Sequence, residues 1–342
     1  MEVGAIASQR FGYDSLGNGE IERLAPDAYA LAGLPTTQSN IATFAFARRL
    51  ALLTQPYETG TWQPITAKAY AEKLLTAANL PPIAGYSLPY LVDASLASLT
   101  VLDINAAKIN EGLQILARAT ACELRTLPDG RISLVPYTAP TAQERVIPNR
   151  DIMQNANASS RSPRVRDVIV NVYSWTADAT VSELAKLTQS GNAVTVYWDS
   201  PAHNVTFIVS TGSITSQTVY ATMAVLTFSS TASKTVTVRG YTLNSATTQH
   251  VRPVNAQGAD ETIDIQLIVN EATAQRCAEH NAMWLNQQLT YTLDHRGEPA
   301  MEVNDGITIQ TPFSPSLDGI LLRSETRLSH GLSGRAIVKV VQ

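Results

Sequence analysis

Hydrophobic and polar positions near the C-terminal end follow first a helical period and then a strand period. Between Asn270 and Leu289, small or apolar residues recur every three or four positions, and Asn270 is a suitable capping residue. The strand period then predicts strands at 289–294 and 303–309, a tight turn at 294–299 between them, and a hairpin of 319–328 and 336–341. A helix followed by a compact β-meander is typical of a scaffold.

A period of two governs the chain from about residue 165 onward. Each predicted strand there has one apolar side, and the positions on it are Val168, Val170 and Val172; Val194, Val196 and Trp198; Val205, Phe207 and Val209; Val219, Ala221 and Met223; and Val236 and Val238. Strands that follow one another this closely, with few helices between them, indicate an antiparallel sandwich or barrel.

Two helices and a hairpin are predicted ahead of that region. Thr66 caps a helix at 67–78, and Asn105 caps a second helix at 106–122. The segment 123–136 is predicted to be a hairpin, because its Pro-Asp-Gly turn combines a fixed φ with a residue that accepts positive φ. These elements predict a small α/β domain.

The chain as a whole is predicted to be an α+β protein dominated by β-strands, with antiparallel β-barrel or sandwich domains and a small inserted α/β domain. The Pro-, Asn- and Ser-rich tract 138–162 is expected to be a linker or crossing loop, and the alternating run 41–48 a strand. The expected parts are an N-terminal β portion at 1–58, the α/β domain at 59–148, a barrel or sandwich at 149–270, and a C-terminal helix with a β-meander packing on that barrel at 271–342.

Composition and charge narrow the class of protein. A chain of 342 residues with 44% hydrophobic residues can build two or three cores, which excludes disorder of the whole. The net charge of −4 is spread evenly, so no basic patch for tight polyanion binding is present. Only 16% of the residues are charged, while Thr, Ser, Asn and Gln are plentiful. Such surfaces suit β-sheets and surfaces buried in an assembly.

The two cysteines and the N-terminal residues bear on the compartment. Cys122 and Cys277 each lie on a predicted helix among small apolar residues, where a buried free thiol is the common state. We therefore expect no disulfide and synthesis in a reducing compartment. The pattern of a signal peptide and a run of about eighteen apolar residues are both absent from the sequence, so neither secretion nor a membrane span is expected.

The histidines do not form a recognisable site. They are His203, His250, His280, His295 and His330. None is paired at metal-ligand spacing, and neither cysteine has a CxxC partner. His280 follows Glu279, but adjacent positions on a helix point about 100° apart, so the two do not form a catalytic dyad.

Two clusters of ionisable residues are further candidates. His295 lies in the run 294–298, on the predicted turn, where polar residues satisfy backbone groups or form salt bridges between subunits. Asp260, Glu261 and Asp264 contain an acidic pair of the glycosidase kind. Asp260 and Asp264 would, however, share one face of a strand entering 265–269, where solvated or lumen-facing charge is the expected role.

No enzyme signature is present elsewhere in the sequence. The GxSxG, P-loop and GxGxxG patterns do not occur. The tryptophans are scattered over several elements and are expected to be core or interface anchors, at Trp62, Trp175, Trp198 and Trp284. We predict no enzyme and no catalytic, cofactor-binding or metal-binding residue.

Several stretches resemble the hub proteins of bacteriophage tails. They are FARRLALLTQPY at 46–57 with ITAKAYAEKLL at 65–75, NEGLQILARATAC at 110–122 leading into the Pro-Asp-Gly hairpin, and the run from Trp284 to the RGEPAMEVNDG at 296–306. Together these regions cover roughly half of the chain, and none carries a catalytic signature.

The resemblance implies a ring-forming protein at the distal end of a tail tube. Family members are typically trimers, and each subunit carries two tube-like β-barrel domains, which mimic six-fold tail symmetry, and two smaller domains. Relatives include the spike bases of contractile injection systems. Here 57–136 would match a small inserted domain and 165–342 a barrel with its companion, whereas 1–40 is too short for a complete first barrel. We expect no cell-wall-cleaving or receptor-binding extension after Gln342.

The expected function is therefore that of a structural virion protein, a tail-tip or baseplate hub. It would be made in the host cytoplasm, assemble as a homotrimer with other tail-tip and tail-tube proteins, and let DNA pass during ejection without specific binding. No cofactor is expected. Two alternatives stay open: a tail-associated cell-wall hydrolase that uses Asp260, Asp264 or His295, and a receptor- or glycan-binding module if 174–250 forms an exposed lectin-like sandwich.

Overall fold

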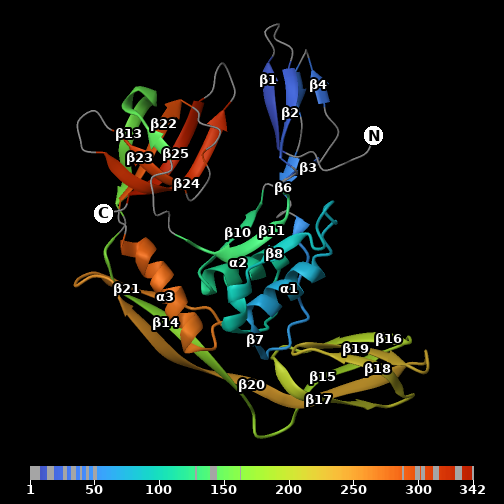
Figure 1. Cartoon of the computed structure of the whole chain (residues 1–342). Coiled ribbons are helices and arrows are strands. Elements are labelled where there is room, and N and C mark those ends of the chain that lie inside the picture. The colour runs from blue at the N-terminus through green and yellow to red at the C-terminus, as the bar shows by residue number, and fades with distance from the viewer. Residues whose placement is uncertain are drawn as a thin grey trace. The chain divides into compact units, whose positions relative to one another are not determined.

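The computed structural model shows a β-dominated α+β protein with two compact units (Figure 1). The first unit consists of Met1–Pro136, Asn171–Gln249 and Asp264–Arg276, and the second of Tyr137–Val170, His250–Ile263 and Cys277–Gln342. The structure describes residues 8–13, 19–25, 29–31, 36–38, 41–43, 46–48, 52–127, 129–138, 145–161, 163–286, 289–296, 301, 305–310, 316–327 and 333–340, with side chains for all of these except those up to 48, 154–161 and 326–327.

The N-terminal part of the first unit contains short antiparallel strand pairs. They are β1 (Ser8–Tyr13) with β2 (Gly19–Ala25), β3 (Tyr29–Leu31) with β6 (Phe46–Arg48), and β4 (Thr36–Gln38) with β5 (Ile41–Thr43). The run 41–48, predicted to be one strand, therefore contributes to two separate pairs.

The two helices and the hairpin predicted ahead of residue 137 lie in the first unit. The elements of this region are β7 (Pro64–Thr66), α1 (Ala67–Ala77), β8 (Tyr90–Val92), the 3-10 helix η2 (Ala94–Ser98), β9 (Thr100–Leu102), α2 (Ile109–Ala119), β10 (Cys122–Thr126) and β11 (Ile132–Pro136). Strands β10, β11 and β8 form a sheet, and β7 pairs with β9. The Thr66 hydroxyl accepts a hydrogen bond from the Ala69 amide at 3.1 Å, which confirms the predicted cap. Pro128, the first residue of the predicted Pro-Asp-Gly turn, lies outside the described residues.

The second helix begins three residues later than its sequence predicts. Lys108, and not Asn105, occupies the N-cap position of α2. Asn105 is instead engaged over a long range: its side-chain oxygen accepts from the Gly60 amide at 2.8 Å, and its side-chain nitrogen donates to the Thr222 hydroxyl at 2.5 Å. Ala106 forms an isolated bridge with Tyr57. These tertiary bonds hold residues 105 and 106 outside the helix.

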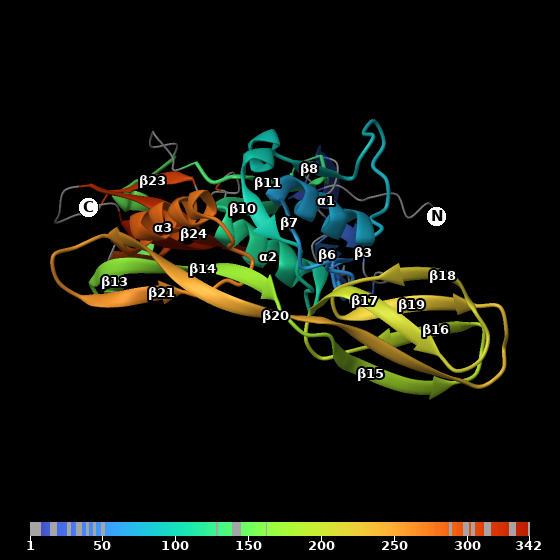
Figure 2. The same ribbon diagram turned by 90° about the horizontal axis from the view of Figure 1, so that it is seen from below.

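A small antiparallel sandwich completes the first unit (Figure 2). Its strands are β15 (Ser182–Gln189), β16 (Ala193–Tyr197), β17 (Ala202–Val209), β18 (Ile214–Val219), β19 (Met223–Phe228) and the first part of β20 (Lys234–Pro253). One sheet has the order β16-β19-β18, and in the other β15 and β17 flank β20. The core between them includes the predicted apolar positions Val194, Val196, Trp198, Val236 and Val238.

One predicted strand of this region is a turn. Val219 ends β18 and Met223 begins β19, so Ala221 lies in the connection between two strands. The Ala221 carbonyl accepts from the Trp198 indole at 2.7 Å and from the Ala202 amide at 2.8 Å, and these bonds keep Ala221 buried. Because Ala221 is buried although it lies in a turn, Val219, Ala221 and Met223 show the alternating apolar spacing that a strand would give.

Two long strands, β14 (Val165–Ala177) and β20, each contribute residues to both units. Strand β14 pairs with β20 on one side and with β21 (Ala259–Ile263), in parallel, on the other. The strand predicted at 265–269 is not formed; a turn stands there, in which the Ile268 amide donates to the Ile265 carbonyl at 2.9 Å. The helix predicted after Asn270 is confirmed as α3 (Glu271–Asn286), and the Asn270 side chain accepts from the Thr273 amide at 2.8 Å.

The second unit is built on a six-stranded sheet. Its order is β12 (Arg145–Ile147), β23 (Gly306–Ile309), β24 (Leu317–Arg327), β25 (Ser333–Val340), β22 (Leu289–Arg296) and β13 (Ile152–Arg161). Strands β23, β24 and β25 form a meander as predicted, but β22 pairs with β25 and not with β23, and its residues 294–296 replace the start of the predicted tight turn. The predicted linker at 138–162 is wrong in part, because β12 and β13 form the two edges of this sheet. An edge strand can be held by backbone bonds without an apolar alternation, so its polar sequence did not indicate a strand.

Candidate functional site

His280 and His295 are engaged in structural contacts, and His330 lies outside the described residues. On α3, the Nε2 atom of His280 accepts a hydrogen bond from the Trp284 indole at 3.1 Å. The His280 ring also packs edge-to-face on Tyr137, with 4.9 Å between the ring centroids. His280 therefore belongs to an aromatic cluster of the second unit.

The cluster around His295 is separated by strand alternation. His295 lies within β22, and not on the predicted turn, with 1% of its surface exposed. Its Nδ1 atom lies 2.6 Å from the Arg296 carbonyl, while Asp294, on the opposite face, pairs with Arg335 at 2.8 Å. Glu298, the last member of the predicted cluster, lies outside the described residues. His295 and Asp294 therefore do not form an acid/base pair.

The acidic candidates serve different partners. Asp260 receives two bonds from the Arg166 guanidinium, at 2.9 and 2.6 Å. Asp264 accepts from the Tyr173 hydroxyl and, at 3.1 Å, from the Asn171 amide. These hydrogen bonds, that of Tyr173 first, lower the pKa of Asp264. Asp264 is thus stabilised in the charged form, and the two carboxylates have separate partners, whereas a glycosidase requires a pair that includes one acid of raised pKa.

The remaining sequence candidates are structural where the structure describes them. Trp62 packs edge-to-face on Trp175 with 4.7 Å between the ring centroids, and Trp198 lies in the sandwich core. Cys122 and Cys277 are free thiols. Among the described residues, no group of three or more His, Cys, Asp or Glu side chains could hold a metal ion. No helix in the described part of the chain is long and apolar enough to span a membrane.

The candidate site of the first unit is a pair of cavities where the α/β domain meets the sandwich. The small cavity has a volume of about 260 Å³ and is lined by Thr61, Gln63, Ala202, His203, Asn204, Val205, Val219, Tyr220 and Ala221. The large cavity, of about 530 Å³, is lined by Tyr57, Thr59, Thr61, Ala69, Glu72, Lys73, Thr76, Ala77 and Tyr220. Thr61 and Tyr220 line both cavities.

The buried carboxylate of Asp103 positions one wall of these cavities. It accepts hydrogen bonds from the Tyr57 hydroxyl, the Thr61 hydroxyl and the Lys73 ammonium, each at 2.8 Å. Its backbone holds the same segment, because the Asp103 carbonyl accepts from the Trp62 amide at 2.7 Å and its amide donates to the Gln63 carbonyl at 3.1 Å. A buried charge with this many partners fixes the local geometry.

The same carboxylate affects the neighbouring tyrosine. Burial is the largest cause that raises the pKa of Tyr57, and the charge of Asp103 is the next. Tyr57 therefore remains a neutral hydrogen-bond donor across the physiological range. Neither Asp103 nor Tyr57 was indicated by the sequence; the available signal was a carboxylate inside the apolar run 99–104.

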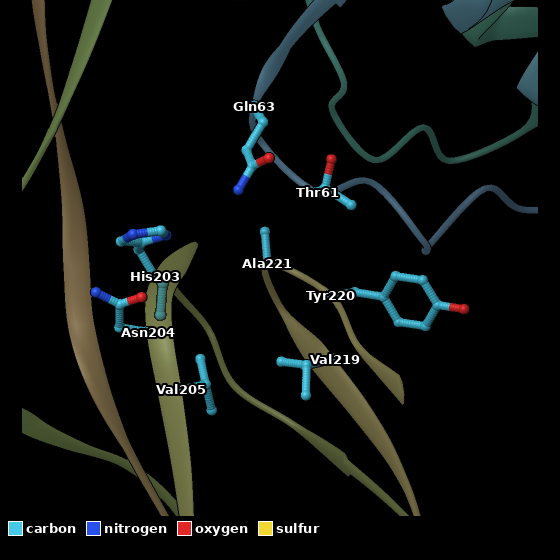
Figure 3. A pocket seen from close by; sticks show the side chains of 9 residues that line it. Thr61, Gln63, His203, Asn204, Val205, Val219, Tyr220 and Ala221 are labelled. Carbon is cyan, nitrogen blue, oxygen red and sulfur yellow. The ribbon is translucent and has the colours of Figure 1, made fainter. Parts of the chain in front are cut away.

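The opposite wall comes from the sandwich. His203 and Asn204 lie on β17, and in Figure 3 the Gln63 amide points toward the side of the cavity that carries His203. The ring of Tyr220 extends away from His203 (Figure 3). Of these residues the sequence singled out only His203, as an unpaired histidine. The others come from distant segments, so no local pattern could have brought them together.

The junction itself is tightly packed. The Ala221 amide donates to the Gly60 carbonyl at 3.1 Å, and Asn105 bonds both Gly60 and Thr222. A Cβ atom on Gly60 would lie 2.5 Å from the Ile104 carbonyl carbon, so only glycine fits there. One backbone bond and one side-chain bond thus join the α/β domain and the sandwich beside the two cavities.

Comparisons with known proteins give similarities of shape only. Neither the known protein families nor curated protein sequences match this chain. The crystal structure of the tail protein from Neisseria meningitidis MC58 is 10% identical, with 91% of this chain and 78% of that chain covered and a TM-score of 0.45. The prophage MuSo2 43 kDa tail protein from Shewanella oneidensis is also 10% identical, with 94% of this chain and 78% of that chain covered and a TM-score of 0.44.

A third solved structure has a similar level of likeness. Prophage tail protein gp18 from Listeria monocytogenes EGD-e is 11% identical, with 91% of this chain and 76% of that chain covered and a TM-score of 0.41. All three solved structures are described as tail proteins, and two of them as prophage tail proteins. Their TM-scores lie below 0.5, and similarity at this level does not by itself assign a function.

Proposed function

We propose that this chain is a structural subunit of a bacteriophage tail, and that copies of it form a ring at the tail tip. The observation that carries the proposal is the fold of the segments that resemble tail hubs. The segments 65–75 and 110–122 form the helices of a separate α/β domain, and the segment 284–306 enters the six-stranded sheet of the second unit. A small α/β domain and a β-rich C-terminal part are both features that the resemblance implies.

The six-stranded sheet offers two different edges for assembly. A closed ring of head-to-tail contacts requires two distinct surfaces on each subunit. Strand β12 forms one edge and exposes 50% of Val146, while β13 forms the other edge and exposes 57% of Met153. The edge of β13 is irregular, with shifts of register against β22. Side-chain contacts, rather than continued backbone pairing, therefore suit this edge.

The proposed assembly is a homotrimer that connects the tail tube to the distal tip and leaves a channel for DNA. The hydrolase alternative has little support among the described residues, because Asp260, Asp264 and His295 are engaged in separate structural contacts. A structural role requires no reactive group. It does require apolar or polar surface that copies of the chain can bury against one another.

Ring formation can be tested with the purified chain by native mass spectrometry and negative-stain imaging. We expect a trimer mass and rings with three-fold symmetry. Val146→Lys and Met153→Lys should each dissociate the rings, because an ammonium group would be buried without a partner in the interface. Val181→Lys, at an exposed apolar position of the first unit, is the matched control and should leave the rings intact.

A compensating variant sharpens this test. In the double variant Val146→Lys/Met153→Glu, each edge contact between copies would bring a lysine close to a glutamate, and rings should partly reform. A chain that remains monomeric at every concentration contradicts the ring proposal. Rings that survive both single lysine variants contradict the choice of edges.

A further inference from the structure

The small cavity of the first unit has a neutral, hydrogen-bonding lining. None of its nine lining residues carries a carboxylate, ammonium or guanidinium group, and five of them have a polar side-chain group: Thr61, Gln63, His203, Asn204 and Tyr220. This lining offers no opposite charge that would select an ionic ligand. From this lining we propose that the small cavity binds one ring of a neutral saccharide. The proposal is independent of ring assembly at the tail tip.

Gln63 supplies the wall of the α/β domain with a polar group for a ligand that carries hydroxyl groups. The Thr61 hydroxyl points away from His203 in Figure 3 and donates to Asp103 at 2.8 Å, so Thr61 positions the segment that carries Gln63. The Gln63 side chain is exposed and points into the cavity (Figure 3). An amide offers both a donor and an acceptor, so it can bond two neighbouring hydroxyl groups of a sugar.

A β-bulge shapes the wall on the sandwich. Between His203 and Thr206, the register of β17 against β20 shifts, so that Asn204 and Val205 together face a single position of β20. Asn204 has a φ of 50°, which is uncommon for a residue other than glycine. Gly240 of β20 makes room, since a Cβ atom there would lie 3.2 Å from the His203 carbonyl. Bulges of this kind redirect side chains next to binding sites.

The sizes of the two cavities fit a short oligosaccharide. A volume of about 260 Å³ lies just below the range of pockets for drug-sized ligands, so the small cavity suits a single sugar ring. Tyr220 lines both cavities, and its ring extends away from His203 (Figure 3). The face of an aromatic ring packs well on the apolar face of a sugar. A second sugar ring of the ligand would therefore lie against Tyr220 in the large cavity.

The proposal can be tested with the full chain on an array of neutral and sialylated oligosaccharides, followed by calorimetry with the best ligand. We expect binding of at least one neutral oligosaccharide. The double variant Gln63→Ala/His203→Ala should weaken that binding by about tenfold or more, because it removes hydrogen bonds to the ligand. The matched control Gln217→Ala/Thr218→Ala changes exposed residues of β18 outside both cavities and should bind as the unmodified chain does.

Three outcomes would overturn the proposal. They are the absence of any neutral ligand on the array, binding by the double variant that equals that of the control, and preferential binding of sialylated ligands or of inorganic phosphate. Thermal unfolding of each variant verifies that the fold is retained. Ring formation is measured separately, so failure of one proposal is distinguishable from failure of the other.

Discussion

Lys234 places an ammonium group within the sandwich, with only 1% of the residue exposed. The ammonium donates to the Gly191 carbonyl at 2.7 Å and lies 4.9 Å from the centroid of the Phe228 ring. Removing the charge while keeping the volume relieves the desolvation of the ammonium. Lys234→Met should therefore change the free energy of unfolding by no more than about 1 kcal/mol.

Lys234→Ala is the informative counterpart, because it also removes the packed methylene groups. We expect it to lower the free energy of unfolding by about 2 kcal/mol or more through the cavity that it leaves. Urea unfolding of both variants measures the difference. If the Met variant loses as much stability as the Ala variant, the bond to Gly191 and the contact with Phe228 dominate over packing.

The bond between Tyr173 and Asp264 makes stability depend on pH. It lowers the pKa of Asp264 below the ordinary value of 3.8. Its stabilisation is therefore fully present above about pH 4 and is lost as the pH falls through the lowered pKa. Burial and the same partner raise the pKa of Tyr173 to about 12, so the phenol contributes below pH 10 and loses its contribution between pH 10 and 12.

Asp264→Asn tests the acid side of this dependence. The variant should be less stable than the unmodified chain at neutral pH, and the difference should shrink as the pH falls below 3.8. Urea unfolding at a series of pH values measures the two curves. Parallel curves over the whole acid range would show that Asp264 is not responsible.

At the scale of elements, Gly60 joins the α/β domain and the sandwich. A Cβ atom at this position would approach backbone atoms of Ile104 and Asn105, which cannot move without breaking the bond between Asn105 and Thr222. Gly60→Ala should lower the free energy of unfolding by about 1–3 kcal/mol, the range for overpacking. Gly85→Ala is the control: nothing lies within 4 Å of its added Cβ, so only the cost of its positive φ is expected. Equal losses in both variants would contradict the close packing at Gly60.

At the scale of the whole molecule, the net charge determines whether the chain would bind DNA. The net charge is −4, with 25 basic and 29 acidic residues. A protein without excess positive charge gains little from counterion release at the phosphates. The purified chain should therefore not retard duplex DNA in a gel at about 0.1 M salt. Retention that disappears steeply with added salt would reveal a basic surface and contradict a non-adhesive channel.

The sequence by itself determined the elements whose stabilising contacts are local. Thr66 and Asn270 cap helices within three residues, and the strand period of the sandwich follows from burial of one face. The β-dominated α+β class follows from these elements. Local contacts of this kind depend only on residues that are neighbours in the chain, so periodicity and capping residues were sufficient to find them.

The tertiary structure decided what depends on distant partners. Asn105 could cap a helix, but its bonds to Gly60 and Thr222 move the start of α2. The polar strand β13 exists because β22 supplies its backbone partners. The two cavities combine segments near residues 60, 203 and 220, which only folding brings together. Such contacts form only when residues far apart in the sequence come together, which requires the chain to close long loops. The residue pattern of a single segment therefore does not predict them.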